Sequence, residues 1–185
     1  MALREILTEP NEILRTKSLS VEKVDQDLQT LMDDMLETMY AAPGIGLAAI
    51  QVGVPKRVIV IDIGQRDKIE NESDEKQEIK KNPMFFINPE IIDKSKINST
   101  YEEGCLSVPG QFAEIDRPDK CHIKYLDYYG SIKEIRAEGM LATCIQHEMD
   151  HLEGILFIDY LSKLKKTMII RKLSKQKKAI ERIVV

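Results

Sequence analysis

Residues 146–154 read QHEMDHLEG and hold two of the three histidines in the chain. His147 and His151 are four residues apart, so on a helix they lie on the same face and can bind one ion together. Glu148 directly follows the first histidine and completes the H-E-x-x-H pattern of metallohydrolases, in which the glutamate is the general base. The segment therefore predicts a metal-binding helix.

A catalytic metal site of this kind needs a third protein ligand, and the sequence leaves more than one source open. A third histidine six residues after the second is excluded, because that position is Phe157. Cys144 precedes His151 by seven residues, about 10 Å along a helix axis, which is too far for both to reach one ion. The remaining candidates are Cys105 in the segment EGCLSVPG, His122 in a predicted strand, and an acid after His151 such as Glu181.

The segments around this helix predict an α+β domain. Besides the motif helix at about 140–152, apolar residues at helical spacing predict helices at about 25–42 and 160–182. Runs that are rich in branched residues, or that alternate, predict short strands at 57–63, 84–92, 120–127 and 132–137. Helices at both ends favour mixed or antiparallel sheets packed around the central motif helix, with a long C-terminal helix.

Composition and the N-terminus predict a cytoplasmic protein. The 185 residues are 43% hydrophobic, which is ordinary for a globular domain with a sizeable core. No stretch approaches the roughly 18 apolar residues of a membrane span. The first twelve residues include three glutamates and lack the apolar run of a secretion signal. Three cysteines are too few, and odd in number, for a disulfide scaffold.

Two segments differ from the rest of the chain in charge. Between Gly64 and Asn82, eleven of seventeen residues are charged, which predicts a solvated insertion over 65–81. Residues 162–182 include nine Lys or Arg and one Glu, a balance of +8 that leaves −12 for the remainder. Such a basic segment is either a solvated helix face or a surface for a polyanion. We divide the chain into a catalytic domain, 1–160, and a basic C-terminal helix or tail, 161–185.

Three segments together resemble the signature motifs of the peptide deformylase family, in that family's order and spacing. They are GIGLAAIQ at 44–51, EGCLS at 103–107 and QHEMDH at 146–151. The resemblance extends from about residue 3 to residue 175. It implies that a metal-bound hydroxide attacks the formyl carbonyl of N-formylmethionine on newly made proteins and releases formate. It also implies a monomer, and some members of the family dock on ribosomal RNA through the C-terminal helix.

The same resemblance assigns roles to particular residues. It implies that the metal ligands are Cys105, His147 and His151. Glu148 would be the general acid and base, while Gln51 and the backbone N–H of Leu106 would stabilise the oxyanion. Fe²⁺ is the expected native ion, with Zn²⁺, Ni²⁺ or Co²⁺ able to replace it, although ligand softness alone suits zinc as readily as iron.

Further residues are expected to bind the substrate or to support the site. Met140, Thr143 and Cys144 lie within about 60° of His147 around an ideal helix and would line a largely apolar pocket for a methionine side chain. The predicted substrate-binding set is completed by Ile45, Gly46, Tyr101 and Gly104. Asp150 and Glu103 are expected either to share Arg117 as a partner or to be ordinary surface charges.

Two other functions are compatible with a metal site of this composition. One is a different amidase or peptidase that acts on unformylated peptides. The other is an inactive metal-binding domain, which would have no need to retain Glu148 and Gln51.

Overall fold

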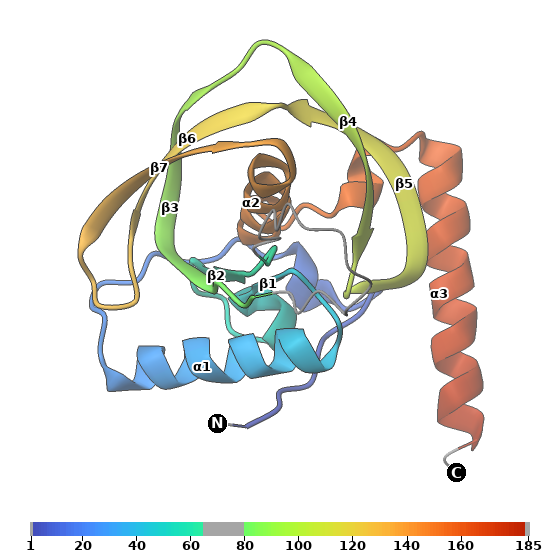
Figure 1. Ribbon diagram of the computed structural model, residues 1–185. Helices are drawn as coiled ribbons and strands as arrows, with labels where there is room; N and C mark the ends of the chain where they lie inside the picture. Colours follow the sequence, from blue (N-terminus) through green and yellow to red (C-terminus); the bar gives the residue numbers. More distant parts are fainter. Residues whose placement is uncertain (1, 65–79, 184–185) are drawn as a thin grey trace, which may run out of the picture.

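The computed structural model describes residues 2–64 and 80–183. Curved strands surround the helix that carries the H-E-x-x-H pattern, and a long C-terminal helix lies to one side (Figure 1). The helices are α1 (Gln26–Ala41), α2 (Gly139–Leu152) and α3 (Lys163–Ile183), with short 3-10 helices η1 (Glu12–Arg15), η2 (Ala49–Val52) and η3 (Phe157–Tyr160). The strands are β1 (Gly46–Ala48), β2 (Val58–Ile61), β3 (Met84–Lys94), β4 (Asn98–Cys105), β5 (Val108–Pro118), β6 (Lys120–Leu126) and β7 (Ile132–Glu138).

Five of the strands form one antiparallel sheet in the order β1-β2-β3-β6-β7. Within the described residues, β1 is an edge strand that pairs only with β2. Pro89 lies inside β3, where its missing N–H would break a regular ladder. The pairing of β3 with β6 shifts register between Ile87 and Glu90, so the proline falls at this irregularity.

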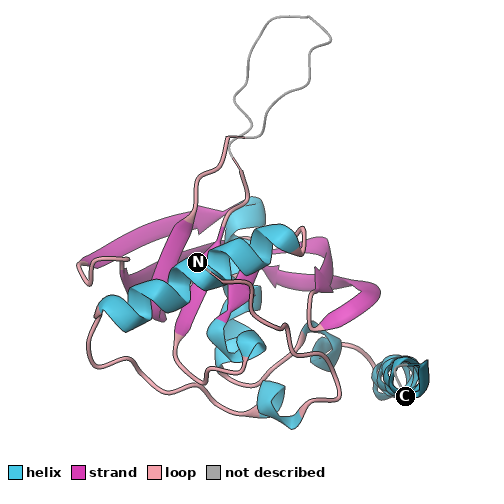
Figure 2. Ribbon diagram, turned by 90° about the horizontal axis from the view of Figure 1, so that it is seen from below, coloured by secondary structure: helices cyan, strands magenta, loops and turns pink. Residues whose placement is uncertain are grey.

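Helices cover both faces of the five-stranded sheet. Because successive side chains of a strand point to opposite faces, Val58 and Val60 of β2 pack in the cluster that includes the buried face of α1. Ile59 and Ile61 pack on the other side, in the cluster that includes α2. Figure 2 shows α1 lying across the strands of this sheet, with α3 seen end-on and away from the sheet. The motif helix is therefore held against the sheet by a row of branched side chains.

The remaining two strands, β4 and β5, form a separate antiparallel hairpin. Cys105 is the last residue of β4, and the turn that follows leads directly into Val108. The hairpin packs beside η3 and α3 through a third apolar cluster, which includes Phe157 and Leu173. This packing brings the end of the hairpin to the same region as α2.

The α+β architecture predicted from the sequence is confirmed, and the three helices begin and end within three residues of the predicted limits. The hairpin β4–β5 was not predicted, and neither was β1. The expected insertion over 65–81 lies outside the described residues, except for its last two. Among the described residues, no helix combines the length and apolar character that would let it cross a bilayer.

Candidate metal centre

Cys105, His147 and His151 meet where the hairpin end lies against α2. One ligand atom from each lies within 4.8 Å of the other two. The Sγ of Cys105 is 3.2 Å from Nε2 of His151. The two imidazole rings are 5.0 Å apart at an interplanar angle of 78°, as expected for residues one helical turn apart. The third ligand candidate therefore comes from the hairpin and not from the helix.

The other cysteine and histidine candidates lie elsewhere. His122 is on β6, and its Nε2 lies 3.0 Å from a carboxylate oxygen of Glu134. Cys144 has its Sγ 3.8 Å from the carbonyl oxygen of Ile45, and burial raises the pKa of its thiol well above the ordinary value. A neutral, buried thiol suits a cavity wall better than a metal ligand.

His147 is oriented by a buried carboxylate. Its Nδ1 lies 2.8 Å from Oε2 of Glu103, which leaves the other ring nitrogen for an ion. A carboxylate in this position fixes the ring orientation and the tautomer of a metal-binding histidine. Glu103 is 6% exposed, so its charge is compensated by protein groups and not by water.

Arg117 supplies that compensation. Its Nε and Nη2 donate to the two carboxylate oxygens of Glu103, at 2.5 and 3.0 Å. Its Nη1 donates to Asp150 at 2.8 Å, and Asp150 also accepts from the hydroxyl of Tyr160 at 2.9 Å. Burial acts to lower the pKa of Arg117, but Glu103 and Asp150 outweigh it and raise the pKa. The shared guanidinium considered from the sequence is therefore present.

Glu148 lies beside this cluster and is 4% exposed. Within the described part of the chain, its Oε2 has no hydrogen-bond partner. Burial, and to a lesser extent the charges of Glu103 and Asp150, raises its pKa to about 7, against the lowering effect of His147 and Arg117. A carboxyl group with a pKa near neutrality can both accept and return a proton, which is what a general acid and base requires.

The position of Glu148 depends on Gly46 of the edge strand. A Cβ atom at Gly46 would lie 2.8 Å from the carboxylate carbon of Glu148 and closer still to one oxygen. We expect Gly46→Ala to displace this carboxylate and to lower kcat by about 100-fold, as small misplacements of catalytic groups do. Steady-state formate release would measure the effect.

Gly44→Ala is the matched control for this substitution. A Cβ at Gly44 would meet the end of the flexible Leu106 side chain, 2.8 Å away, which can turn aside. We expect a loss smaller than about tenfold for this control, because no catalytic group needs to move. Full activity of Gly46→Ala would show that Glu148 does not need its observed position.

Gln51 and Leu106 both lie close to Cys105. The Oε1 of Gln51 accepts from the backbone N–H of Ala48 at 2.8 Å, which directs its Nε2 toward the hairpin turn. This Nε2 donates to the hydroxyl of Ser107 at 3.0 Å and lies 3.5 Å from Sγ of Cys105. Leu106 follows Cys105 in the hairpin turn. The Gln51 amide is thus a preoriented donor beside the metal cluster.

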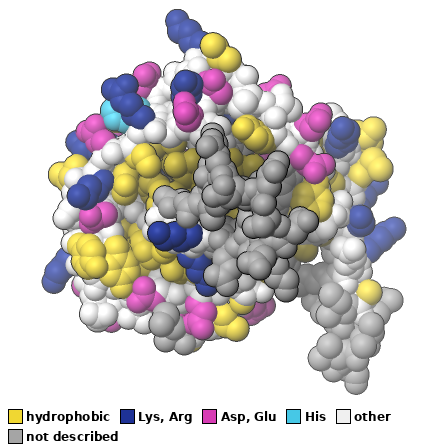
Figure 3. Space-filling model, viewed as in Figure 1, with side chains coloured by type: hydrophobic (Ala, Val, Ile, Leu, Met, Phe, Trp, Pro, Cys, Tyr) yellow, Lys and Arg dark blue, Asp and Glu magenta, His cyan; other side chains and the backbone are white. Residues whose placement is uncertain are grey.

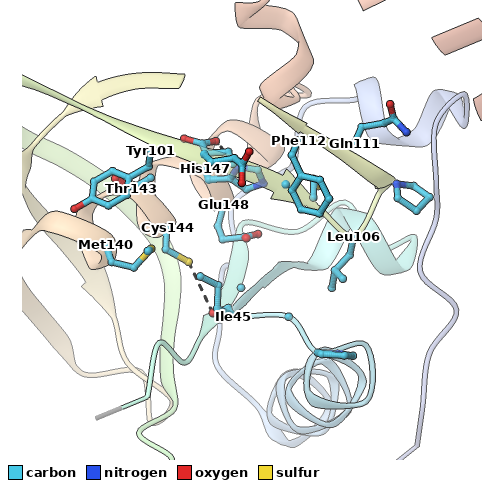
Figure 4. Close-up of a pocket in the computed structure, with 18 of the residues that line it drawn as sticks. Ile45, Tyr101, Leu106, Gln111, Phe112, Met140, Thr143, Cys144, His147 and Glu148 are labelled. Carbon is cyan, nitrogen blue, oxygen red and sulfur yellow. Dashed lines mark hydrogen bonds and ion pairs between the residues drawn. The ribbon is translucent and has the colours of Figure 1, made fainter. Parts of the chain in front are cut away.

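A cavity of about 440 Å³ opens onto the centre. This volume lies in the range of small-molecule sites. Figure 4 shows Glu148 between the upper wall, with Tyr101 and Thr143, and the lower side formed by Ile45 and Leu106. Every residue that the sequence suggested for substrate or oxyanion binding lines this cavity: Ile45, Gly46, Gln51, Tyr101, Gly104, Leu106, Met140, Thr143 and Cys144.

Some lining residues were not predicted from the sequence. Phe112 and Gln111 come from β5 and line the same cavity, and Phe112 is 66% exposed. A Cβ at Gly104 would lie 2.6 Å from the Phe112 ring, so this glycine lets the ring lie flat on the hairpin. The apolar and polar alternation of 113–116 could have revealed this strand.

The three donors fit a divalent transition metal. Metal–ligand bonds of about 2.0–2.3 Å place the donor atoms of one ion about 3–4 Å apart, and the cluster is close to this spacing. One thiolate and two imidazoles suit zinc or ferrous iron. Three protein ligands also leave a coordination position open, as in catalytic sites.

Comparisons with known proteins agree with this geometry. A family model described as polypeptide deformylase matches residues 3–167. A peptide deformylase from Pelagibacter ubique (strain HTCC1062) is 62% identical over 177 residues, which are 96% of each chain. The crystal structure of the peptide deformylase from Ehrlichia chaffeensis in complex with actinonin is 46% identical, with a TM-score of 0.85, and covers 95% of this chain and 98% of that one.

A structure with a bound peptide is also similar. The Met-Ala-Ser-bound class I type b peptide deformylase from Acinetobacter baumannii is 32% identical, with a TM-score of 0.75, over 86% of this chain and 99% of that one. The matches span both the hairpin cysteine and the motif helix. The resemblance noted for the three sequence motifs is therefore confirmed. The chain belongs to the polypeptide deformylase family, metal-dependent hydrolases that remove the N-formyl group from nascent peptides.

Proposed function

We propose that this enzyme hydrolyses the formyl amide of N-formylmethionyl peptides with Glu148 as its proton-transfer group. One observation carries the assignment to particular residues. A buried carboxyl group without a partner in the described chain lies between a Cys/His/His cluster and an apolar cavity. Hydrolysis of an amide needs these three parts together: a polarised water, a proton carrier and a place for the substrate.

The metal ligands proposed are Cys105, His147 and His151. A divalent ion held there supplies Lewis acidity and acidifies a water molecule. Fe²⁺ is proposed as the native ion, with Zn²⁺, Ni²⁺ or Co²⁺ able to replace it, and the thiolate and imidazole donors are compatible with this choice.

Glu148 accepts a proton from the attacking water and gives one to the nitrogen of the leaving amine. Because its pKa is raised to about 7, the ionised carboxylate is available for the first step, and the acid it becomes is available for the second. The carboxyl group is held in place by the close approach of Gly46. Water is largely excluded from it, since it is only 4% exposed.

The formyl oxygen gains negative charge as the water attacks. The Nε2 of Gln51 is a neutral donor whose direction is fixed by the Ala48 N–H. The N–H of Leu106 is fixed beside Cys105 by the hairpin turn. A donor of this kind typically contributes about 2.7–4 kcal/mol to stabilisation of the transition state.

The cavity and the edge strand are proposed to hold the substrate. Met140, Thr143, Cys144, Ile45 and Tyr101 give a wall of suitable size for a methionine side chain. Beyond this side chain, the edge of β1 that pairs with no second strand among the described residues offers backbone groups to an extended peptide, which would add one strand to the sheet. Gly46 and Gly104 keep the approach to the centre open.

Other expectations stay predictions. They are the division at residue 160, a monomeric state, a cytoplasmic location and ribosome docking through α3. Lys and Arg side chains lie on the face of α3 at the right-hand side of Figure 3. Exposed basic side chains on the described part of α3 are compatible with docking on phosphates: Lys163, Lys165, Arg171, Lys172 and Lys175.

The test of the proposed function is formate release from N-formyl-Met-Ala-Ser, using protein purified without oxygen. We expect rapid release that a chelator abolishes and that added Fe²⁺ restores, with one ion bound per chain. N-acetyl-Met-Ala-Ser is the control for the acyl group, because its methyl group is larger than the formyl hydrogen.

Unformylated Met-Ala-Ser separates this function from that of a peptidase. Cleavage of its peptide bonds, with no formate from the formylated peptide, would overturn the proposal in favour of a peptidase. If neither peptide reacts although one ion is bound per chain, the protein is a metal-binding domain without deformylase activity.

A further inference from the structure

The segment that precedes η1 connects two parts of the site through its backbone. The N–H of Leu7 donates to the carbonyl oxygen of Gln51, in η2, at 2.8 Å. The N–H of Glu9 donates to the carbonyl oxygen of Ser107, in the turn between β4 and β5, at 2.9 Å. The two acceptor residues are fully buried and also contact each other, since Nε2 of Gln51 donates to the hydroxyl of Ser107 at 3.0 Å. Residues 7–9 therefore link η2 to the hairpin turn where the Gln51 amide connects them.

The contact with Ser107 determines the direction of the Gln51 amide. An amide NH₂ group carries two hydrogens, and the hydroxyl of Ser107 accepts one of them. The same Nε2 lies 3.5 Å from Sγ of Cys105, so the group is beside the proposed metal ligands. Under the proposed function, the second hydrogen is the one that the formyl oxygen accepts. A displacement of Ser107 would therefore turn the oxyanion donor away from its acceptor.

The side chain of Glu9 is fixed by Arg15. Glu9 is 5% exposed, and its Oε1 accepts from Nε of Arg15 at 3.1 Å and also from Nη2. Among the described residues, Arg15 is the only donor to this carboxylate. The third guanidinium nitrogen, Nη1, donates to Asp159 of η3 at 2.5 Å. Because a buried carboxylate without a partner is unfavourable, loss of Arg15 would drive Glu9 out of its position.

The backbone of Arg15 is held against the end of the metal-binding helix. Leu14, next to it, is fully buried. A Cβ atom at Gly154, two residues after α2, would lie 2.5 Å from the carbonyl oxygen of Arg15, so the two backbones are in close contact. Further along, the N–H of Ser18 donates to the carbonyl oxygen of Leu152, the last residue of α2, at 2.8 Å. The guanidinium group therefore extends from a base that is fixed relative to the site.

We propose that Arg15 is a positioning residue that acts through Glu9 and Ser107. By fixing Glu9 it keeps the Glu9 N–H on the hairpin turn, and the turn keeps the Gln51 amide in its donating direction. This inference rests on the proposed function, in which Gln51 stabilises the oxyanion. Arg15 is not among the described residues that line the cavity at the metal centre, so it acts on the reaction only through other groups.

Arg15→Met removes the guanidinium group and keeps a side chain of similar length. We expect it to lower kcat for N-formyl-Met-Ala-Ser by about tenfold, because a catalytic donor is displaced but not removed. KM should stay within about twofold of the wild-type value, since the oxyanion develops only in the transition state. Arg15→Lys should recover part of the loss, because it keeps the charge without the two bonds to Glu9. Formate release, metal content and urea unfolding are measured for each variant.

A double-mutant cycle separates positioning of the amide from a general effect on the fold. Gln51→Ala removes the donor and should lower kcat by about 100-fold. When Arg15→Met is added to Gln51→Ala, the further loss should be less than about twofold, because the group that Arg15 positions is gone. If Arg15→Met does not fold, the same cycle is measured with Arg15→Lys, with an expected loss of about threefold that also disappears beside Gln51→Ala.

Arg4→Met is the matched control. Arg4 forms the same kind of ion pair in the same N-terminal segment, since its side chain and that of Asp34 are 34% and 7% exposed, against 30% and 5% for Arg15 and Glu9. Its partner is on α1, so we expect a similar loss of stability with kcat within about twofold of the wild type.

Three results would overturn the role of Arg15 while leaving the deformylase activity established. They are an unchanged kcat in a folded, metal-loaded Arg15→Met protein, an equal loss of kcat in Arg4→Met, and a loss in the double variant that is the full product of the two single losses. Absence of formate from the wild type with one ion bound per chain would instead overturn the proposed function.

Discussion

Glu148→Ala is expected to lower kcat for N-formyl-Met-Ala-Ser by about 10²–10⁴-fold, the usual contribution of a general acid and base. The carboxyl group is buried beside the metal cluster, and no other residue of α2 can replace it in the same position. The measurement is steady-state formate release, together with the metal content of the purified variant. One bound ion per chain is expected, because Glu148 is not among the clustered ligand atoms.

Glu148→Gln refines this experiment. Glutamine keeps the volume of the side chain but cannot accept a proton, so its loss of activity should be as large as that of alanine. Glu138→Gln is the matched control, since Glu138 lies at the other end of α2 and its side chain is 76% exposed. If either Glu148 variant kept activity within tenfold of the wild type with metal bound, another group would have to carry the proton.

Arg117→Met is expected to weaken both the fold and the metal site. It would leave the buried Glu103 and the half-buried Asp150 without their shared cation. Breaking a buried ion pair by removing one partner typically costs about 3–5 kcal/mol of unfolding free energy. Because Glu103 orients His147, metal affinity should also fall by about 10–100-fold, as for other groups that support metal ligands.

Urea unfolding and competition with a metal-binding dye would measure the two effects. Arg117→Lys should give an intermediate loss, because an ammonium group keeps the charge but cannot bond to both oxygens of Glu103 in the same geometry. Arg136→Met on the exposed face of β7 is the control and should change stability by less than about 0.5 kcal/mol. Wild-type metal affinity in a folded Arg117→Met protein would contradict the role of this network.

Local spacing predicted the helix that carries the candidate site and the two histidines that we propose as ligands on it. His147 and His151 needed no tertiary information, because one helical turn separates them. Residue chemistry alone left Cys105, His122 and a later acid open as third ligands. Only the structure shows that the hairpin end reaches α2, while His122 is paired with Glu134 on β6. Local residue spacing does not predict which segments far apart in the sequence come into contact.

The missed hairpin has a physical explanation. Glu103 and Arg117 face the interior of the protein as a bonded charge pair, so the rule that polar residues face water misreads both strands. Phe112 has the opposite character, a large apolar ring exposed at the rim of the cavity. Strand β1 was missed because three residues are too few to establish a periodicity.

The position of β1 at the edge of the described sheet has a consequence for how widely such an enzyme can act. A strand edge recognises N–H and C=O groups, which are the same in every polypeptide whatever its side chains. Under the proposed function, the cavity wall reads the first side chain. The edge of β1 would hold the residues downstream through groups common to all proteins. A single small catalyst can therefore serve an entire proteome, with no need for a separate enzyme for each N-terminal sequence.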